Sequence, residues 1–150
     1  LGRNLYLQSG PLDVKENMSF QYEPKIIGDK GYWLQPKFLY LGVTVEYTET
    51  HGFVPVMEGK SSLGRMGTES HICAGMGDNG FCGHWTLEIR VMAPTLVYPG
   101  MPIGQLVYHT IEGDTGLSYR ETGSYNTKAS DNPMPVLPNL WKKPHQFITI

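Results

Sequence analysis

The 150-residue sequence predicts an all-β protein, folded as a distorted barrel or jelly roll. Three observations lead to this prediction. Glycine and proline are frequent, at 18 and 11 residues, and both punctuate turns. Several segments alternate apolar and polar residues with a period of two, which is typical of strands. No segment longer than about ten residues keeps the 3.6-residue period of a helix.

The first clear strand is residues 39–47, which read LYLGVTVEY. Its odd-numbered residues are apolar or aromatic, and they alternate with Tyr40, Gly42, Thr44 and Glu46. This alternation predicts a strand with one buried face. The residues expected on that face are Leu39, Leu41, Val43, Val45 and Tyr47.

Two further strands follow, at residues 84–91 (HWTLEIRV) and 103–110 (IGQLVYHT). The second is entered through the turn YPGM at 98–101, and turn-forming stretches such as GDNGFCG and EGDTG separate the strands. In the strand 84–91, one face is predicted to carry Trp85, Leu87, Ile89 and Val91. The other face is predicted to carry His84, Thr86, Glu88 and Arg90.

Residues 61–67, SSLGRMG, gather two hydroxyl groups and a guanidinium within five residues, in a stretch interrupted by two glycines. No helical pattern follows them, so we expect a turn or loop here. The segment has two interpretations. It is either a solvated turn, as such compositions usually are, or a set of polar groups held for a ligand.

Composition narrows the function classes. One domain covers residues 1–150, and the net charge of −2 disfavours broad nucleic-acid binding while allowing a small anionic ligand. No apolar run approaches the roughly 20 residues of a membrane span, and no secretory leader is recognisable. Cys73 and Cys82 form neither a disulfide framework nor a paired zinc motif. We therefore expect a cytoplasmic protein.

Glu88 is a carboxylate in mid-strand, between two apolar residues. A half-buried carboxylate without a partner is a candidate general base. The alternatives are a solvated face of the sheet or an ion pair with Arg90. In the loop at residues 70–83, Ala74 and Gly75 leave main-chain groups open to a ligand.

Two other residues of that loop have open roles. Asp78 is either an ordinary Asx turn or an acceptor for a sugar hydroxyl. Phe81 either stacks on a ring or belongs to the core.

From about residue 116 the alternation ends and prolines accumulate. We therefore divide the chain into a β core at 1–115 and a C-terminal arm at 116–150. The arm is predicted to be flexible, ordering on a ligand or a neighbouring subunit, with a frayed tail as the alternative.

The order GKSSLGRMG, SHICAGMGDNGFCG, TLEI and YPGMPIGQLV resembles the dCTP deaminase/dUTPase superfamily, and its deaminase branch in particular. The resemblance runs from Leu1 to about Lys128. LGRNLYLQ looks like the early strand that follows the family's N-terminal helix, so we expect the N-terminal part of the family fold to be missing. The glutamate in TLE is what separates the deaminases from plain dUTPases.

The resemblance implies roles for individual residues. Glu88 would be the base, Ser61 and Arg65 would lie beside the reacting ring and its water, and Ala74 would offer main-chain groups. Substrate-binding positions are implied at Lys60, Ser62, Gly75, Asp78, Gln105, Tyr119, Tyr125 and Lys128. The sites would be shared between the subunits of a homotrimer.

The implied activity is hydrolysis of dCTP to dUTP and ammonia. The H-x-E and P-C-x-x-C motifs of zinc deaminases are missing from the sequence, so we expect no zinc. Mg²⁺ would enter only with the triphosphate, and dTTP is a candidate inhibitor. A bifunctional enzyme that continues to dUMP and diphosphate is the first alternative. A non-catalytic nucleotide-binding relative and a plain dUTPase follow.

The sequence favours the simple deaminase because it departs from the family pattern in two places. Met76-Gly77-Asp78 replaces a bulky residue followed by Ile-Asp, and the motif in the arm is about two residues shorter, by comparison with the family it resembles. Both changes fall on the phosphate side of the expected site.

Overall fold

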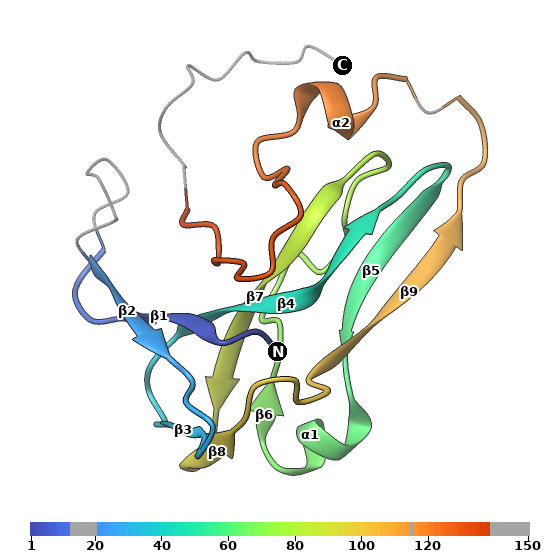
Figure 1. Cartoon of the computed structure of the whole chain (residues 1–150). Coiled ribbons are helices and arrows are strands. Elements are labelled where there is room, and N and C mark those ends of the chain that lie inside the picture. The colour runs from blue at the N-terminus through green and yellow to red at the C-terminus, as the bar shows by residue number, and fades with distance from the viewer. Residues whose placement is uncertain (13–20, 115, 139–150) are drawn as a thin grey trace.

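A computed structural model describes residues 1–12, 21–114 and 116–138 (Figure 1). Strands dominate these residues, and the two helices are each about one turn long, which confirms the all-β prediction. In chain order the elements are β1 (Asn4–Gln8), β2 (Tyr22–Ile26), β3 (Tyr32–Leu34), β4 (Tyr40–Glu49), β5 (Phe53–Gly59), α1 (Ser61–Arg65), β6 (Thr68–Glu69), β7 (Cys82–Val91), β8 (Thr95–Val97), β9 (Gly104–Thr110) and α2 (Tyr119–Thr122).

The strands form one large sheet and two ribbons. The large sheet has five strands in the order β2-β1-β4-β7-β6, and every pairing in it is antiparallel. The ribbons are β3-β8 and β5-β9. In Figure 1 the β5-β9 ribbon lies beside β4 and β7, and α1 and α2 occupy opposite ends of the molecule.

β7 confirms the strand predicted at 84–91. Trp85, Leu87, Ile89 and Val91 are all buried and belong to the main core. Phe81 joins them, with its ring centroid 4.9 Å from that of Trp85, so its role is in the core. The strand predicted at 103–110 is also confirmed, as β9.

The single buried face predicted for residues 39–47 is wrong. The four residues at 40–43 are all buried, whereas Val45 is 48% exposed. The even-numbered face, not the predicted odd-numbered one, contacts the main core. Tyr40 belongs to that core, and a Cβ built on Gly42 would lie 2.7 Å from Ile89. Leu41 packs instead in a second, small cluster with Tyr22. The first half of β4 is covered on both faces, so alternation alone does not identify its core side.

The prediction of a turn or loop at 61–67 is also wrong in part, because Ser61–Arg65 form the helix α1. The carbonyl of Lys60 accepts hydrogen bonds from the N–H groups of Leu63 and Gly64, both at 3.0 Å. Leu63 is buried in the main core. One apolar anchor is enough to hold a single helical turn that is too short to show a period.

The described part of the arm lies against the same chain. Its residues bind β7 through hydrogen bonds that include His84 N–H to Thr127 Oγ1 at 3.0 Å, Ser130 N–H to His84 Nε2 at 3.1 Å, and Val136 N–H to Thr86 Oγ1 at 2.8 Å. Thr86 lies on the face of β7 that also carries Glu88. Residues 139–150 of the predicted arm lie outside the described residues.

The loop between β6 and β7 is held on β5 by main-chain hydrogen bonds. Met57 N–H donates to the carbonyl of Gly75, and Gly77 N–H donates to the carbonyl of Pro55, both at 2.7 Å. A Cβ on Gly75 would lie 2.6 Å from the Met57 carbonyl oxygen. Only glycine therefore fits this close approach of two backbones.

We predict that Gly75→Ala destabilises the protein by about 1–3 kcal/mol, because the added methyl forces the loop away from β5. Gly64→Ala is the matched control. Apart from its two chain neighbours and the backbone of α1, no described atom lies within 4 Å of a Cβ built there. That change should be neutral or stabilise by up to about 1 kcal/mol, since alanine reduces the entropy of the unfolded chain. Urea unfolding at one protein concentration measures both, and equal stability of Gly75→Ala and wild type would contradict the prediction.

Candidate functional site

A polar hollow forms where the β5-β9 ribbon meets α1. Its volume is about 540 Å³. The β5-β9 register brings Gln105 opposite Glu58, and so places Gln105 next to the start of α1. The residues that line the hollow are Glu58, Gly59, Lys60, Ser61, Ser62 and Gln105. The structure thus brings together four of the predicted site residues, the consecutive Lys60, Ser61 and Ser62 and the distant Gln105.

Arg65 ends α1, and its side chain is exposed. Within residues 1–12, 21–114 and 116–138 it has no ion pair. The guanidinium is therefore available to a ligand or to another chain. A cation in the last turn of a helix is also favourable for the helix itself, which is a purely structural role that Arg65 fills at the same time.

Glu88 lies half-buried on the outer face of β7, opposite Leu41 of β4. Its Oε2 atom accepts a hydrogen bond from the Cys73 main-chain N–H at 3.1 Å. The Cys73 thiol Sγ is 3.8 Å from the same oxygen. Tyr22 packs with Leu41, the residue opposite Glu88. Burial raises the pKa of the Tyr22 phenol, and the negative charge of Glu88 raises it further.

Arg90 does not neutralise Glu88. Its guanidinium binds the Glu69 carboxylate, with Nη2 and Nε at 2.8 and 2.9 Å from Oε2. The alternative in which Glu88 and Arg90 form an ion pair is therefore wrong. The pair with Glu69 crosses from β7 to the edge strand β6 and is solvent-exposed, so it adds little to stability.

Ala74, next to the Glu88 contact, has a backbone φ of +56°. This left-handed conformation is unusual for a residue with a Cβ and costs about 1 kcal/mol. Non-glycine residues in such conformations concentrate at functional sites. The bend turns the chain between the Cys73 N–H, which meets Glu88, and the Gly75 carbonyl, which is bound to β5.

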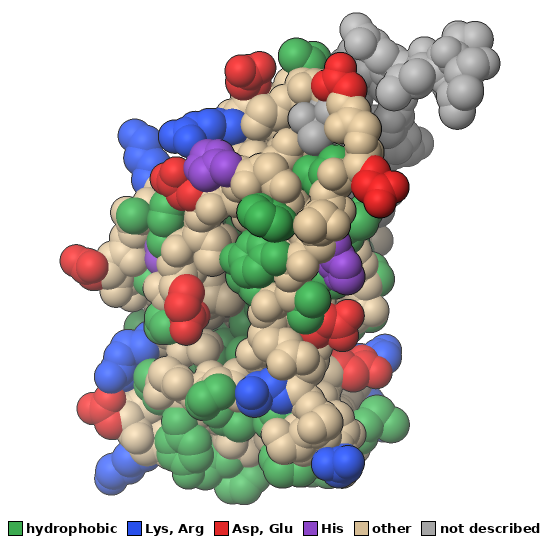
Figure 2. All heavy atoms as spheres, turned by 90° about the vertical axis from the view of Figure 1, so that its right-hand side faces the viewer, with side chains coloured by type: hydrophobic (Ala, Val, Ile, Leu, Met, Phe, Trp, Pro, Cys, Tyr) green, Lys and Arg blue, Asp and Glu red, His purple; other side chains and the backbone are tan. Residues whose placement is uncertain are grey.

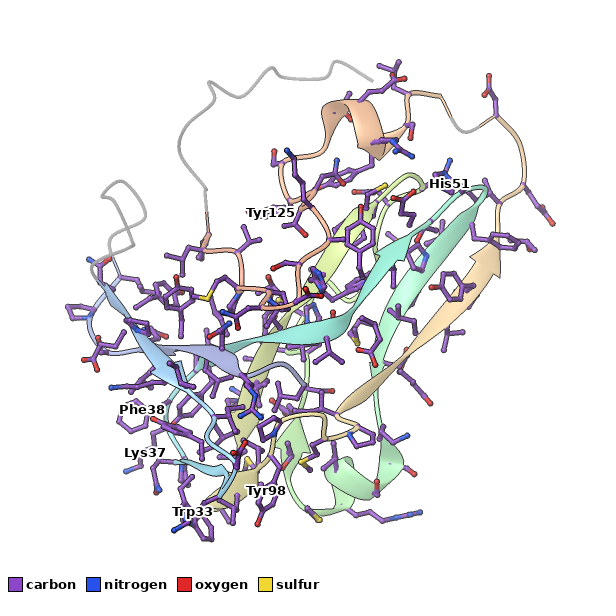
Figure 3. The ribbon with its side chains drawn as sticks, viewed as in Figure 1. Trp33, Lys37, Phe38, His51, Tyr98 and Tyr125 are labelled. Atoms are coloured by element: carbon purple, nitrogen blue, oxygen red, sulfur yellow. The ribbon has the colours of Figure 1, made fainter. Side chains whose placement is uncertain are left out.

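The arm residues predicted to cover the phosphates lie elsewhere. Tyr119 packs on Phe81, with ring centroids 6.3 Å apart, and its hydroxyl accepts a hydrogen bond from Tyr125 N–H. Figure 3 places Tyr125 beside α2, at the opposite end of the molecule from α1. Lys128 is exposed. Within one chain, these three residues are therefore not brought to Lys60 and Ser62.

Asp78 is the one predicted residue that does approach the arm. Its carbonyl accepts the Phe81 N–H in a turn, and its side chain is exposed. Burial raises the pKa of the Tyr119 phenol most, and the negative charge of Asp78 raises it as well. The Asp78 carboxylate therefore lies near Tyr119, with the side chain open to solvent.

The described residues thus contain two separate groups of predicted site residues. One is the hollow at α1, and the other is Glu88 with the loop at Cys73, Ala74 and Gly75. In the described parts of the chain no hydrogen bond or ion pair joins Glu88 to Ser61 or Arg65. Sequence reasoning gave no site role to Cys73, although it lies in the stretch SHICAGMGDNGFCG, or to Tyr22, because no local pattern records which side chain each one approaches.

Three further expectations can be compared with the structure. Neither described helix has the length or the apolar run needed to cross a membrane. Both cysteines are free, and Cys73 is exposed while Cys82 is buried. No group of three His, Cys, Asp or Glu side chains gathers to hold a metal ion in the described ranges.

Comparison with known proteins places the fold in a family. A model described as dCTP deaminase-like matches residues 5–111. Proteins named "dCTP deaminase, dUMP-forming" are similar to this chain. The one from Cytophaga hutchinsonii is 50% identical over 109 residues, covering 73% of this chain and 62% of its own length. The one from Leptospira biflexa is 47% identical over 133 residues, covering 89% and 74%.

A more distant likeness concerns the fold alone. The crystal structure of 2′-deoxycytidine 5′-triphosphate deaminase from Agrobacterium tumefaciens is 21% identical, with a TM-score of 0.63. The match covers 73% of this chain and 37% of that one. The family model spans more than half of the sequence, and its limits enclose the hollow at α1 as well as Glu88 and its loop. The chain therefore belongs to the dCTP deaminase-like family.

Proposed function

We propose that the chain deaminates dCTP and carries the product on to dUMP. One water replaces the amino group of cytosine, releasing ammonia and leaving dUTP. A second water cleaves dUTP to dUMP and diphosphate. The observation that carries the proposal is Glu88, a half-buried carboxylate that no cation of the described residues neutralises and that faces a strained loop. Membership of the family supports it.

Glu88 is the group proposed to move protons in the deamination. It takes a proton from the attacking water as that water bonds to C4 of cytosine. The carboxyl group gives this proton to N3. It then takes a second proton from the new C4 hydroxyl, as the C4 carbonyl forms and the C4–N bond breaks, and gives that proton to the leaving ammonia. Its Oε2 is held by Cys73, and Oε1 accepts no hydrogen bond from the described residues. The main-chain groups at Ala74 are proposed to hold the ring and the water.

The hollow at α1 is proposed to bind the triphosphate. Lys60 supplies a cation, and Ser62 and Gln105 supply neutral donors beside it. Glu58 adds a carboxylate, so the lining combines a phosphate-binding cation with the oxygen ligands that Mg²⁺ prefers. These residues fit a triphosphate that arrives with Mg²⁺, and the ion would neutralise phosphate charge. Zinc has no proposed role.

We propose that each site is completed by a second copy of the chain, in a homotrimer. Glu88 and Arg65 then meet across the contact between copies, which accounts for their separation within one chain. The β5-β9 ribbon offers surface for such a contact. Figure 2, which looks onto this side of the molecule, shows apolar side chains at the middle of the face and along its lower edge. Phe53, Val107 and Tyr108 of the ribbon are between 39% and 49% exposed.

The second candidate is the simple deaminase that the sequence favoured, which stops at dUTP. It rests on the unusual Met76-Gly77-Asp78 segment and the shortened arm. Several relatives at 40–50% identity, including one from Clostridium botulinum that is matched over 93% of this chain, are named dUMP-forming. We therefore set the bifunctional activity first.

Incubation with dCTP and Mg²⁺ tests the proposal directly. We expect ammonia, dUMP and diphosphate in equal amounts, with little free dUTP. Chromatography of the nucleotides, with separate assays of ammonia and diphosphate, measures all four. Ammonia with dUTP and no diphosphate would establish the simple deaminase instead. A parallel incubation with dUTP and Mg²⁺ identifies the remaining cases. Diphosphate from dUTP without ammonia from dCTP would indicate a dUTPase, and no product from either nucleotide would indicate a non-catalytic relative.

Replacing the proposed base should abolish the ring chemistry but spare binding. We predict that Glu88→Gln lowers kcat for ammonia release by about 10²–10⁴-fold, because the amide cannot accept the proton of the water. Calorimetric titration with dCTP should give an affinity close to that of wild type. Glu23→Gln is the control, since Glu23 is an exposed strand glutamate that pairs with Lys25. More than about a tenth of wild-type turnover in Glu88→Gln would make Glu88 structural.

Shared sites predict complementation between two inactive variants. Glu88→Gln and Arg65→Ala each damage every site in a trimer of identical copies. In trimers formed at random from equal amounts of both, about a quarter of the sites combine an intact Glu88 with an intact Arg65. Co-expression with two different affinity tags should therefore restore ammonia release to about that fraction. If mixed trimers are no more active than the separate variants, the two residues do not meet across a subunit contact.

A further inference from the structure

Two atoms of Cys73, its main-chain nitrogen and its sulfur, contact the Glu88 carboxylate. The main-chain N–H and the thiol both approach Oε2 of the carboxylate, at 3.1 and 3.8 Å. The two oxygens of Glu88 are therefore unequal, since Oε1 receives no hydrogen bond from the residues that the structure describes. A carboxylate fixed through one oxygen presents the other in a defined direction.

The position of Cys73 is itself fixed by the loop that carries it. Ala74 turns the chain through its left-handed backbone, and the Gly75 carbonyl is bound to Met57 N–H on β5 at 2.7 Å. Cys73 therefore lies between two strands. Its loop is hydrogen-bonded to β5, and its thiol contacts Glu88 on β7. Its side chain is exposed, so a reagent of small size can reach it.

We propose that the Cys73 thiol is a positioning residue for Glu88. It donates a hydrogen bond to Oε2 and so orients Oε1 toward the water that attacks the cytosine ring. This inference rests on the proposed deaminase activity, and Cys73 itself does not touch the reacting atoms. The thiol acts in addition to the main-chain N–H, which any residue except proline would retain at this position.

A pair of substitutions separates the thiol's hydrogen bond from the volume it fills. Cys73→Ala should lower kcat for ammonia release by about three- to thirtyfold, with KM for dCTP within about twofold of wild type. Cys73→Ser keeps a donor and should recover most of the loss. Cys82→Ala is the control, because Cys82 is buried and its thiol approaches the Gly80 carbonyl instead. Equal losses in the serine and alanine variants, or no loss in either, would overturn the proposal.

Alkylation by iodoacetamide tests the Cys73–Glu88 contact without any substrate. The folded protein is alkylated and then digested, and mass spectrometry of the peptides gives an alkylation rate for each cysteine. The buried Cys82 serves as the internal reference. In Glu88→Ala the thiol loses its hydrogen-bond partner and gains space, so Cys73 should react about three- to tenfold faster. An unchanged rate would overturn the proposal.

The alkylation experiment also separates this inference from the proposed function. If the wild-type protein releases no ammonia, the deaminase proposal fails on its own assay. Faster alkylation of Cys73 in Glu88→Ala would then still support the contact, and an unchanged rate would refute it.

Discussion

The two faces of β7 are the constraint on which the rest of the molecule depends. Leu87, Ile89 and Val91 are buried in the main core and set the register of the strand against β4. Because side chains alternate along a strand, this register sends Thr86 and Glu88 to the opposite face. A slip of one residue would bury the carboxylate in an apolar core, which is costly without a partner. The packing of the core therefore determines where the proposed base lies.

The outer face of β7 is covered by segments that are distant in sequence. The arm binds it through Thr86 and His84, and the cluster around Tyr22 and Leu41 packs nearby. His84 is buried, and its Nε2 accepts a main-chain N–H while Nδ1 lies 3.2 Å from the Thr44 carbonyl oxygen. These contacts leave Glu88 half-buried between the arm and the loop. Within the described residues, Cys73 binds Oε2 of this carboxylate, and Oε1 accepts no hydrogen bond.

The polar hollow at α1 and the Glu88 region are built by different parts of the chain. The hollow depends on the β5-β9 register and on one helical turn anchored by Leu63. The Glu88 region depends on β7 and on the loop bound to β5. A dCTP molecule that used both would need them to face a common space. Contact between copies of the chain is the simplest physical route to that arrangement, and the exposed apolar side chains of the β5-β9 ribbon are suited to it.

The sequence by itself determined the all-β class, the strands β7 and β9, the buried face of β7 and the family. These follow from periodicity and from ordered motifs, which are local properties of the chain. Only the tertiary structure decided which face of β4 meets the core, because residues 40–43 are covered on both sides. It also decided that Arg90 pairs with Glu69 rather than with Glu88, and that Cys73 holds the Glu88 carboxylate. Those partners are joined by strand pairing and loop packing between distant segments, and no local pattern records such contacts.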